Sequence, residues 1–108
     1  RKADLVDNGT LVEIKSGDGP LSQHDIGQFK DFMKVASTHS VVAYGSPHIT
    51  QVHYVMISPE AALANRKWIY DSLSENKKLS IELFDRSGQA HIFKETNLDQ
   101  LTHFFEGF

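Results

Sequence analysis

The tripeptide Asp7-Asn8-Gly9, which separates two short apolar runs, constrains the fold more than any other part of the sequence. Asn-Gly is the strongest short-range signal for a β-hairpin, because both residues tolerate the positive φ angles of a type I′ turn. Along the second run, residues 10–15, successive side chains point to opposite faces of the sheet, so Glu13 and Lys15 share one face. We therefore predict an antiparallel hairpin that folds Asp4 back beside the Glu13–Lys15 end.

This hairpin would bring three charged groups together at one end of a β-ribbon: the carboxylates of Asp4 and Glu13 and the ammonium group of Lys15. Burying such a set costs free energy unless a cation or a substrate compensates the charges. Groups of this kind gather at functional sites, and we interpret the set as a site. The alternative is an ordinary charged edge of a hairpin, where solvated charges are common.

The composition sets limits on the class of protein. A chain of 108 residues forms one domain, residues 1–108, with 40% apolar and 23% charged residues as in soluble globular proteins. The absence of Cys excludes a disulfide framework and a thiolate zinc site. The His residues lack the spacing of a zinc site, so a bound Zn²⁺ is disfavoured. Independently of this, we expect His53 to be a surface group. No apolar run is long enough to span a membrane, and at a net charge of −3 any nucleic-acid contact requires a local basic patch.

The rest of the chain alternates between helical and strand patterns, which predicts an α/β fold with a mixed β-sheet flanked by helices. A strand–helix–strand unit implies a right-handed crossover, which would set the Val41–Tyr44 strand parallel to the Glu13 strand. The predicted elements are a helix from Ser22 to residues 37–40, strands at Val41–Tyr44 and 51–57, a helix over 58–74, strands at 79–83 and 90–93, and a last helix capped by Asn97.

The charged set suits the hydrolysis of a phosphodiester bond. Two carboxylates, from Asp4 and Glu13, and the backbone carbonyl of Ile14 would form an oxygen-rich site for Mg²⁺ or Mn²⁺. These ions keep open water positions at which a substrate can bind. Lys15, on the same face as Glu13, would orient or polarise the attacking water.

These residues resemble a family. Asp4, followed after a short hairpin by Glu13-Ile14-Lys15, resembles the PD-(D/E)xK nuclease superfamily, which has the restriction-endonuclease-like fold. Gln28, with Phe32 four residues later, is similar to the Gln-x-x-x-Tyr helix motif of several branches, with Phe in place of Tyr. The resemblance implies that Gln28 lies near the metal or the substrate. It also implies an initial helix and strand, which the sequence lacks, so we expect a C-terminal piece of a longer protein.

The Lys-Ser-Gly loop that leads into the Gln-bearing helix is similar to C-terminal nuclease domains of contact-dependent inhibition and other polymorphic toxins. This resemblance implies an endonuclease for DNA or tRNA, delivered from a secreted or cell-surface protein into the cytoplasm of a target bacterium and neutralised by an immunity protein. Lys15, Gln28 and His24 would contact the substrate. Gln28 and His24 can equally be plain helix-surface residues, and the whole domain can be an inactive nuclease-fold module that binds protein or nucleic acid.

Overall fold

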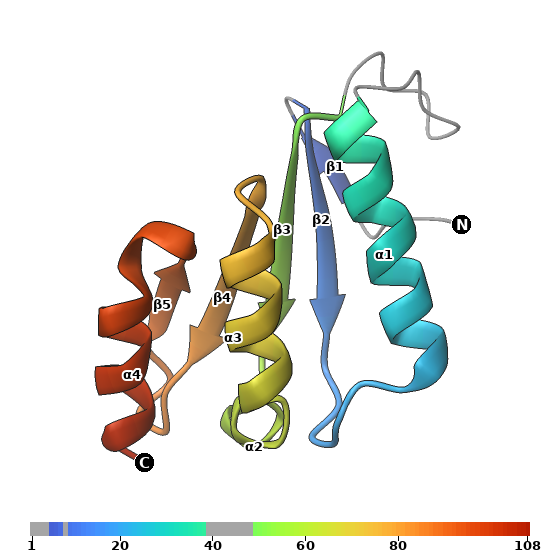
Figure 1. Cartoon of the computed structure of the whole chain (residues 1–108). Helices are drawn as coiled ribbons and strands as arrows, with labels where there is room; N and C mark the ends of the chain where they lie inside the picture. Colours follow the sequence, from blue (N-terminus) through green and yellow to red (C-terminus); the bar gives the residue numbers. More distant parts are fainter. Residues whose placement is uncertain (1–4, 8, 39–48) are drawn as a thin grey trace.

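The computed structural model describes residues 5–7, 9–38 and 49–108, and its α/β architecture confirms the predicted fold class (Figure 1). In chain order the elements are β1 (Leu5–Asp7), β2 (Thr10–Lys15), α1 (Gln23–Thr38), β3 (Gln51–Met56), α2 (Pro59–Ala64), α3 (Arg66–Glu75), β4 (Leu79–Phe84), β5 (Ala90–Phe93), the 3₁₀ turn η1 (Glu95–Asn97) and α4 (Leu98–Glu106).

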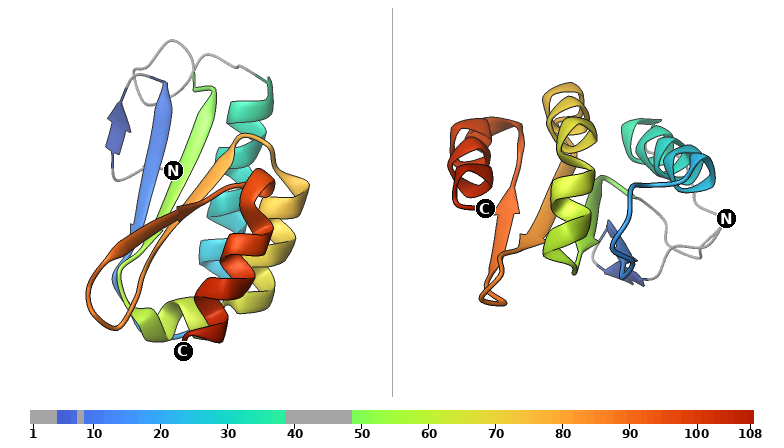
Figure 2. Two further views of the ribbon diagram at one scale, coloured as in Figure 1. Left: turned by 90° about the vertical axis from the view of Figure 1, so that its left-hand side faces the viewer. Right: turned by 90° about the horizontal axis from the view of Figure 1, so that it is seen from below.

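The five strands form one mixed sheet in the order β1-β2-β3-β4-β5. The three central strands are parallel to one another, and β1 and β5 are antiparallel to their neighbours. The helices α1, α3 and α4 lie side by side on one face of the sheet (Figure 2). No helix of the described ranges lies on the opposite face, which we call the uncovered face.

The first hairpin is confirmed. Asp7 pairs with Thr10 and Leu5 pairs with Val12, so two positions form the turn, as the Asn-Gly signal predicts. Gly9 has a φ of 81°, a conformation that glycine adopts without a steric cost. The turn chemistry therefore sets the register of the hairpin.

The parallel neighbour of β2 is β3, the strand predicted at residues 51–57. In this register Glu13 lies opposite Tyr54 and Lys15 lies opposite Met56. The strand predicted at Val41–Tyr44 falls outside the described residues, so its place in the sheet stays a prediction. The helix α1 thus lies in the connection between β2 and β3, over the face of the sheet that forms the core.

The helix α1 begins at the position that the sequence predicts. The hydroxyl of Ser22 accepts a hydrogen bond from the Asp25 backbone N–H at 3.1 Å, and the Asp25 carboxylate accepts one from the Ser22 N–H at 3.2 Å. This reciprocal pair is a capping box. Further along the helix, Phe29, Met33 and Ala36 are buried, as their helical spacing predicts.

The prediction of one helix over residues 58–74 is wrong, because the helix breaks at Asn65. Its start is as expected, with Pro59 in the first turn and the Ser58 hydroxyl accepting two backbone hydrogen bonds. Asn65 has φ −108° and ψ 18°, outside the helical range, and separates α2 from α3. Its side chain bonds to the backbone of Leu21, Gly19 and Ala61. The bonds to Leu21 and Gly19, which lie in a loop distant in sequence, hold the chain at the point where α2 ends.

One core fills the space between the sheet and its helices. An aromatic group lies at its centre: Phe29 packs edge-on against Tyr54 and Trp68, at centroid distances of 6.0 and 4.9 Å. Such pairs add about 0.5–1.5 kcal/mol each beyond the burial of their area. The fully buried large side chains of this core include Leu11, Phe32, Ile49, Val52, Met56, Ile69, Leu73, Ile81, Leu83 and Leu101.

The turn between β4 and β5 depends on the left-handed backbone of Gly88, which has a φ of 89°. We expect Gly88→Ala to lower the free energy of unfolding by roughly 1 kcal/mol, because an L-residue is strained at this φ. Gly19→Ala is the matched control, since a Cβ at either glycine has open space within 4 Å but only Gly88 has a positive φ. Urea denaturation measures both variants, and equal losses of stability would contradict the prediction.

Candidate functional site

The strand β2 presents Glu13 and Lys15 on the helix-covered face of the sheet, as the alternation of its side chains predicts. Leu11 points to this face and is fully buried, and Glu13 and Lys15, two and four residues later, are half-buried. Ile14 points to the uncovered face, where its side chain is 45% exposed. The carboxylate of Glu13 and the ammonium group of Lys15 thus lie at the end of β2, beyond the buried Leu11.

Helix α1 lies over this end of the sheet. Tyr54, the residue opposite Glu13 in the ladder, contacts Phe29, which follows Gln28 in α1. Phe32, one turn after Gln28, is fully buried, so this side of the helix points to the sheet, and Gln28 itself is half-buried. The structure therefore places Glu13, Lys15 and Gln28 in the same layer, between the sheet and α1.

The backbone of β2 fixes the direction of the Ile14 carbonyl. The N–H of Ile57 donates a hydrogen bond to the carbonyl of Lys15 at 3.1 Å, so the polar backbone groups of Lys15 point towards β3. In a parallel ladder these groups alternate from one residue to the next. The carbonyl of Ile14 therefore points to the β1 edge, a direction compatible with the predicted role of this carbonyl as a metal ligand.

The carboxylate of Asp4, the other predicted ligand, lies outside the described residues. Its place beside Glu13, one pair beyond Leu5 and Val12, stays a prediction. A glutamate carboxylate and a strand carbonyl are hard oxygen donors, so the donor set fits Mg²⁺ or Mn²⁺. Within residues 5–7, 9–38 and 49–108, no three His, Cys, Asp or Glu side chains are grouped to share a metal ion.

The ammonium group of Lys15 lies beside the loop that follows β2. A Cβ added to Gly17 would stand 3.4 Å from the Lys15 Nζ, so the loop passes within contact distance of this group. The loop leads directly into the first turn of α1, where His24 is exposed. His24 therefore has solvent access, and among residues 5–7, 9–38 and 49–108 it has no hydrogen-bonded partner that would mark it as part of the site.

Sequence reasoning missed a polar network on the uncovered face. Nδ1 of His53 lies 2.6 Å from the Ser80 hydroxyl, and Nε2 lies 2.8 Å from the Glu82 carboxylate. His53 is half-buried, not the plain surface group that was expected. A Ser–His–carboxylate set also occurs at catalytic triads, but this one lies on a strand face, where β3 and β4 bond their backbone N–H groups within the sheet. Backbone N–H groups that are paired within the sheet cannot also form an oxyanion hole beside Ser80. We therefore interpret the network as a bridge between β3 and β4.

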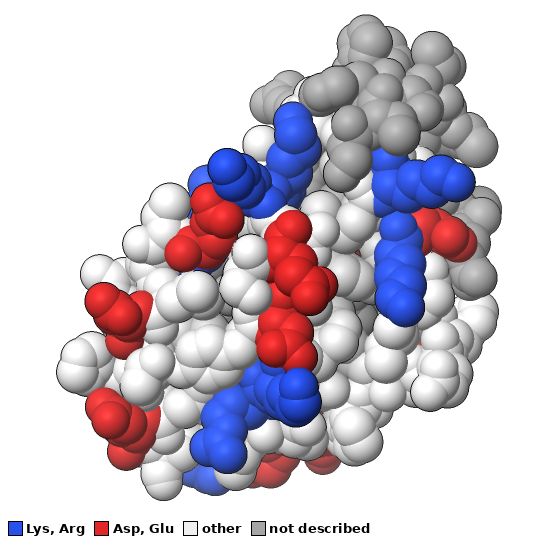
Figure 3. All heavy atoms as spheres, viewed as in Figure 1, with Lys and Arg blue, Asp and Glu red and all other residues white. Residues whose placement is uncertain are grey.

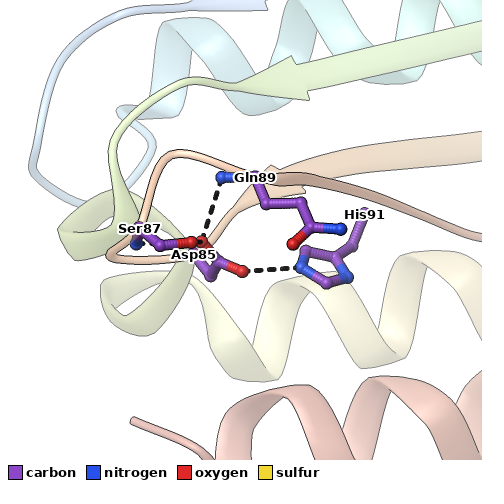
Figure 4. A network of polar contacts seen from close by, with 4 residues as sticks. All are labelled: Asp85, Ser87, Gln89 and His91. Atoms are coloured by element: carbon purple, nitrogen blue, oxygen red, sulfur yellow. Dashed lines mark hydrogen bonds and ion pairs between the residues drawn. The ribbon is translucent and has the colours of Figure 1, made fainter.

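A second polar network closes the β4–β5 turn around Asp85 (Figure 4). One carboxylate oxygen accepts hydrogen bonds from the Ser87 hydroxyl, the Ser87 N–H and the Gln89 N–H, at 2.6, 2.9 and 3.0 Å. The other oxygen lies 2.8 Å from Nε2 of His91. The Ser87 hydroxyl first, then His91 and the Gln89 N–H, stabilise the ionised form and hold the pKa of Asp85 well below its ordinary value.

This lowered pKa makes a testable contribution to stability. A carboxylate with a depressed pKa in the folded state stabilises the protein above the pKa of the unfolded chain, about 4, and the contribution is lost as the pH falls further. We expect Asp85→Asn to shift the urea midpoint most at pH 6–7, and the difference from the parent protein to shrink between pH 4 and 2. Ser87→Ala, which keeps the carboxylate, should show a smaller shift with the same trend. A difference that stays constant with pH would contradict the assignment.

Neither the helices nor comparisons with known proteins assign this chain to a functional class. No helix in the described ranges has the length and apolar character needed to cross a membrane. Comparisons with protein-family models, curated proteins and solved structures give no match. The features of the molecule that bear on its function are therefore the first hairpin, the Glu-x-Lys strand and the helix packed over it.

Proposed function

We propose that this protein is a metal-dependent endonuclease that hydrolyses phosphodiester bonds of DNA or tRNA. The observation that carries the proposal is the position of Glu13 and Lys15. Both lie half-buried on one face of β2, directly after a hairpin in the predicted register and beneath the helix that carries Gln28. A carboxylate and an ammonium group held in this way, next to a strand carbonyl that points towards β1, suit the hydrolysis of a phosphodiester.

In this proposal each residue has a separate role. The carboxylates of Asp4 and Glu13 and the carbonyl of Ile14 would hold Mg²⁺ or Mn²⁺, which when bound supplies Lewis acidity at the scissile phosphate. Lys15 would donate a hydrogen bond to the attacking water or to a phosphate oxygen and stabilise the negative charge that develops there. Gln28 would orient the water or the substrate through its side-chain amide.

The biological setting follows from the resemblance to C-terminal toxin domains. The nuclease would act as an antibacterial module in the cytoplasm of a target bacterium, after delivery as part of a larger secreted or cell-surface protein. A cognate immunity protein would neutralise it. At a net charge of −3, the contacts to nucleic acid must be local rather than spread over the whole surface.

Incubation with nucleic acid tests the proposal directly. The purified protein is mixed with plasmid DNA and, separately, with total tRNA, in the presence of Mg²⁺, Mn²⁺ or EDTA. We expect cleavage of one substrate class with metal and none with EDTA. If a folded sample leaves both nucleic acids intact under every condition, the proposal is overturned in favour of a nuclease-fold binding module. Calorimetry with Mn²⁺ would then show no heat of binding.

A further inference from the structure

A groove of about 410 Å³ lies between α1 and α3, and its lining does not include Glu13, Lys15 or Gln28. This volume falls within the range of protein ligand sites, roughly 300–1,000 Å³. Its floor is apolar and consists of Phe29 and Met33, which are buried, and Ile26 and Trp68, which are half-buried against the core. The ring contact between Phe29 and Trp68 fixes the shape of this floor. The floor therefore suits an apolar side chain.

The two rims of the groove carry opposite charges. Lys30 of α1 stands on one side, and Asp71 and Glu75, one turn apart on α3, stand on the other. Figure 3 shows the same division, with acidic side chains over α3 facing basic ones over α1 across a strip that carries neither sign. Across the described part of the chain, neither Lys30 nor Glu75 makes an ion pair or a side-chain hydrogen bond.

The third rim charge, Asp71, is only weakly engaged. Its carboxylate pairs with Lys67 on the same helix at 3.0 Å, and the two side chains are 56% and 90% exposed. Exposed pairs of this spacing contribute little to stability. Asp71 can therefore exchange Lys67 for a cation of a bound molecule.

We infer that this groove is a docking site for an amphipathic helix of a partner protein, which presents apolar side chains to the floor, basic residues to α3 and acidic residues to α1. Charge complementarity carries the inference. A nucleic acid or an anionic lipid surface would be repelled by Asp71 and Glu75, and a simple cation would be repelled by Lys30. Only a partner that carries both signs on either side of an apolar stripe meets both rims, and opposite charges of this kind fix the orientation of binding.

Two synthetic helical peptides test the inference. The first has a Leu/Trp stripe with Glu along one flank and Lys along the other, and the second has the same stripe with Glu along both flanks. Both are titrated into the ¹⁵N-labelled protein at low salt. We expect the first peptide, docked in one direction, to shift amide resonances of α1 and α3 and to bind roughly fivefold or more tightly than the second. A helix can dock in either direction, but this does not remove the contrast: the first peptide meets both rims in one of its two directions, and the second places Glu against Asp71 and Glu75 in both.

The decisive variant is the double charge reversal Asp71→Lys and Glu75→Lys, which alters only exposed groups of α3 and makes both rims basic. It should reverse the preference between the two peptides. Equal binding of both peptides by both proteins, shifts confined to the uncovered face of the sheet, or no shifts at millimolar peptide would each overturn the inference. Docking is independent of the proposed nuclease, so it should persist unchanged in the Glu13→Gln variant.

Discussion

Replacing Glu13 with glutamine is expected to lower the rate of phosphodiester cleavage by roughly 100-fold or more. Glutamine keeps the size and shape of the side chain but removes the negative charge, and a neutral amide is a poor ligand for Mg²⁺ or Mn²⁺. Glu13 is half-buried and is not part of the apolar core, so the fold should survive the change. The measurement compares initial cleavage rates of the two proteins on the same nucleic acid and in the same metal.

Glu82→Gln is the matched control for this prediction. Glu82 is also a half-buried glutamate on a central strand, but its side chain lies on the uncovered face and contacts His53. Its replacement removes the same charge and should cost about 1 kcal/mol of stability, the worth of a hydrogen bond, while cleavage continues. If Glu13→Gln cleaved at the parent rate, Glu13 would not be a metal ligand. Equal losses of activity in both variants would point to a general effect of charge on folding.

Local chemistry explains why much of the fold is predictable from the sequence. The Asn-Gly turn sets the first hairpin, and Ser22 with Asp25 sets the start of α1. The period of two along β2 places Glu13 and Lys15 on one face without knowledge of any other strand. Each of these features depends on residues that are close together in the chain, where propensity and spacing act directly.

The features that the sequence did not reveal all depend on contacts between distant residues. The network of His53 with Ser80 and Glu82 exists only because β3 and β4 pair in one particular register. The groove between α1 and α3 likewise requires both helices to lie side by side on the sheet. The break at Asn65 requires a loop that lies more than forty residues earlier in the chain. No periodic pattern encodes such contacts.

Asn65→Ala is expected to lower the free energy of unfolding by about 3 kcal/mol, a large share of the 5–15 kcal/mol typical of a small domain. Asn65 is 5% exposed, and its side-chain oxygen accepts a hydrogen bond from the Leu21 N–H at 2.8 Å. Its amide nitrogen donates to the carbonyls of Ala61 and Gly19, at 2.8 and 3.2 Å. Alanine would remove all three bonds and leave the buried N–H of Leu21 without this acceptor. Asn76→Ala, which removes one bond to the Ser72 carbonyl, should cost only about 1 kcal/mol.

Asn65→Asp separates the loss of these bonds from a general loss of packing. The introduced carboxyl group can still accept from Leu21, but its second oxygen would face the carbonyl oxygens of Ala61 and Gly19, which repel a carboxylate. Protonation restores one donor, so the folded state should raise the pKa of this group above its ordinary value of about 4. A raised pKa means that stability falls as the pH rises through it. In urea denaturation, Asn65→Asp should therefore be less stable than Asn65→Ala at pH 7 and recover as the pH is lowered towards 4. Equal, pH-independent losses in the two variants would show that the amide bonds do not hold this junction.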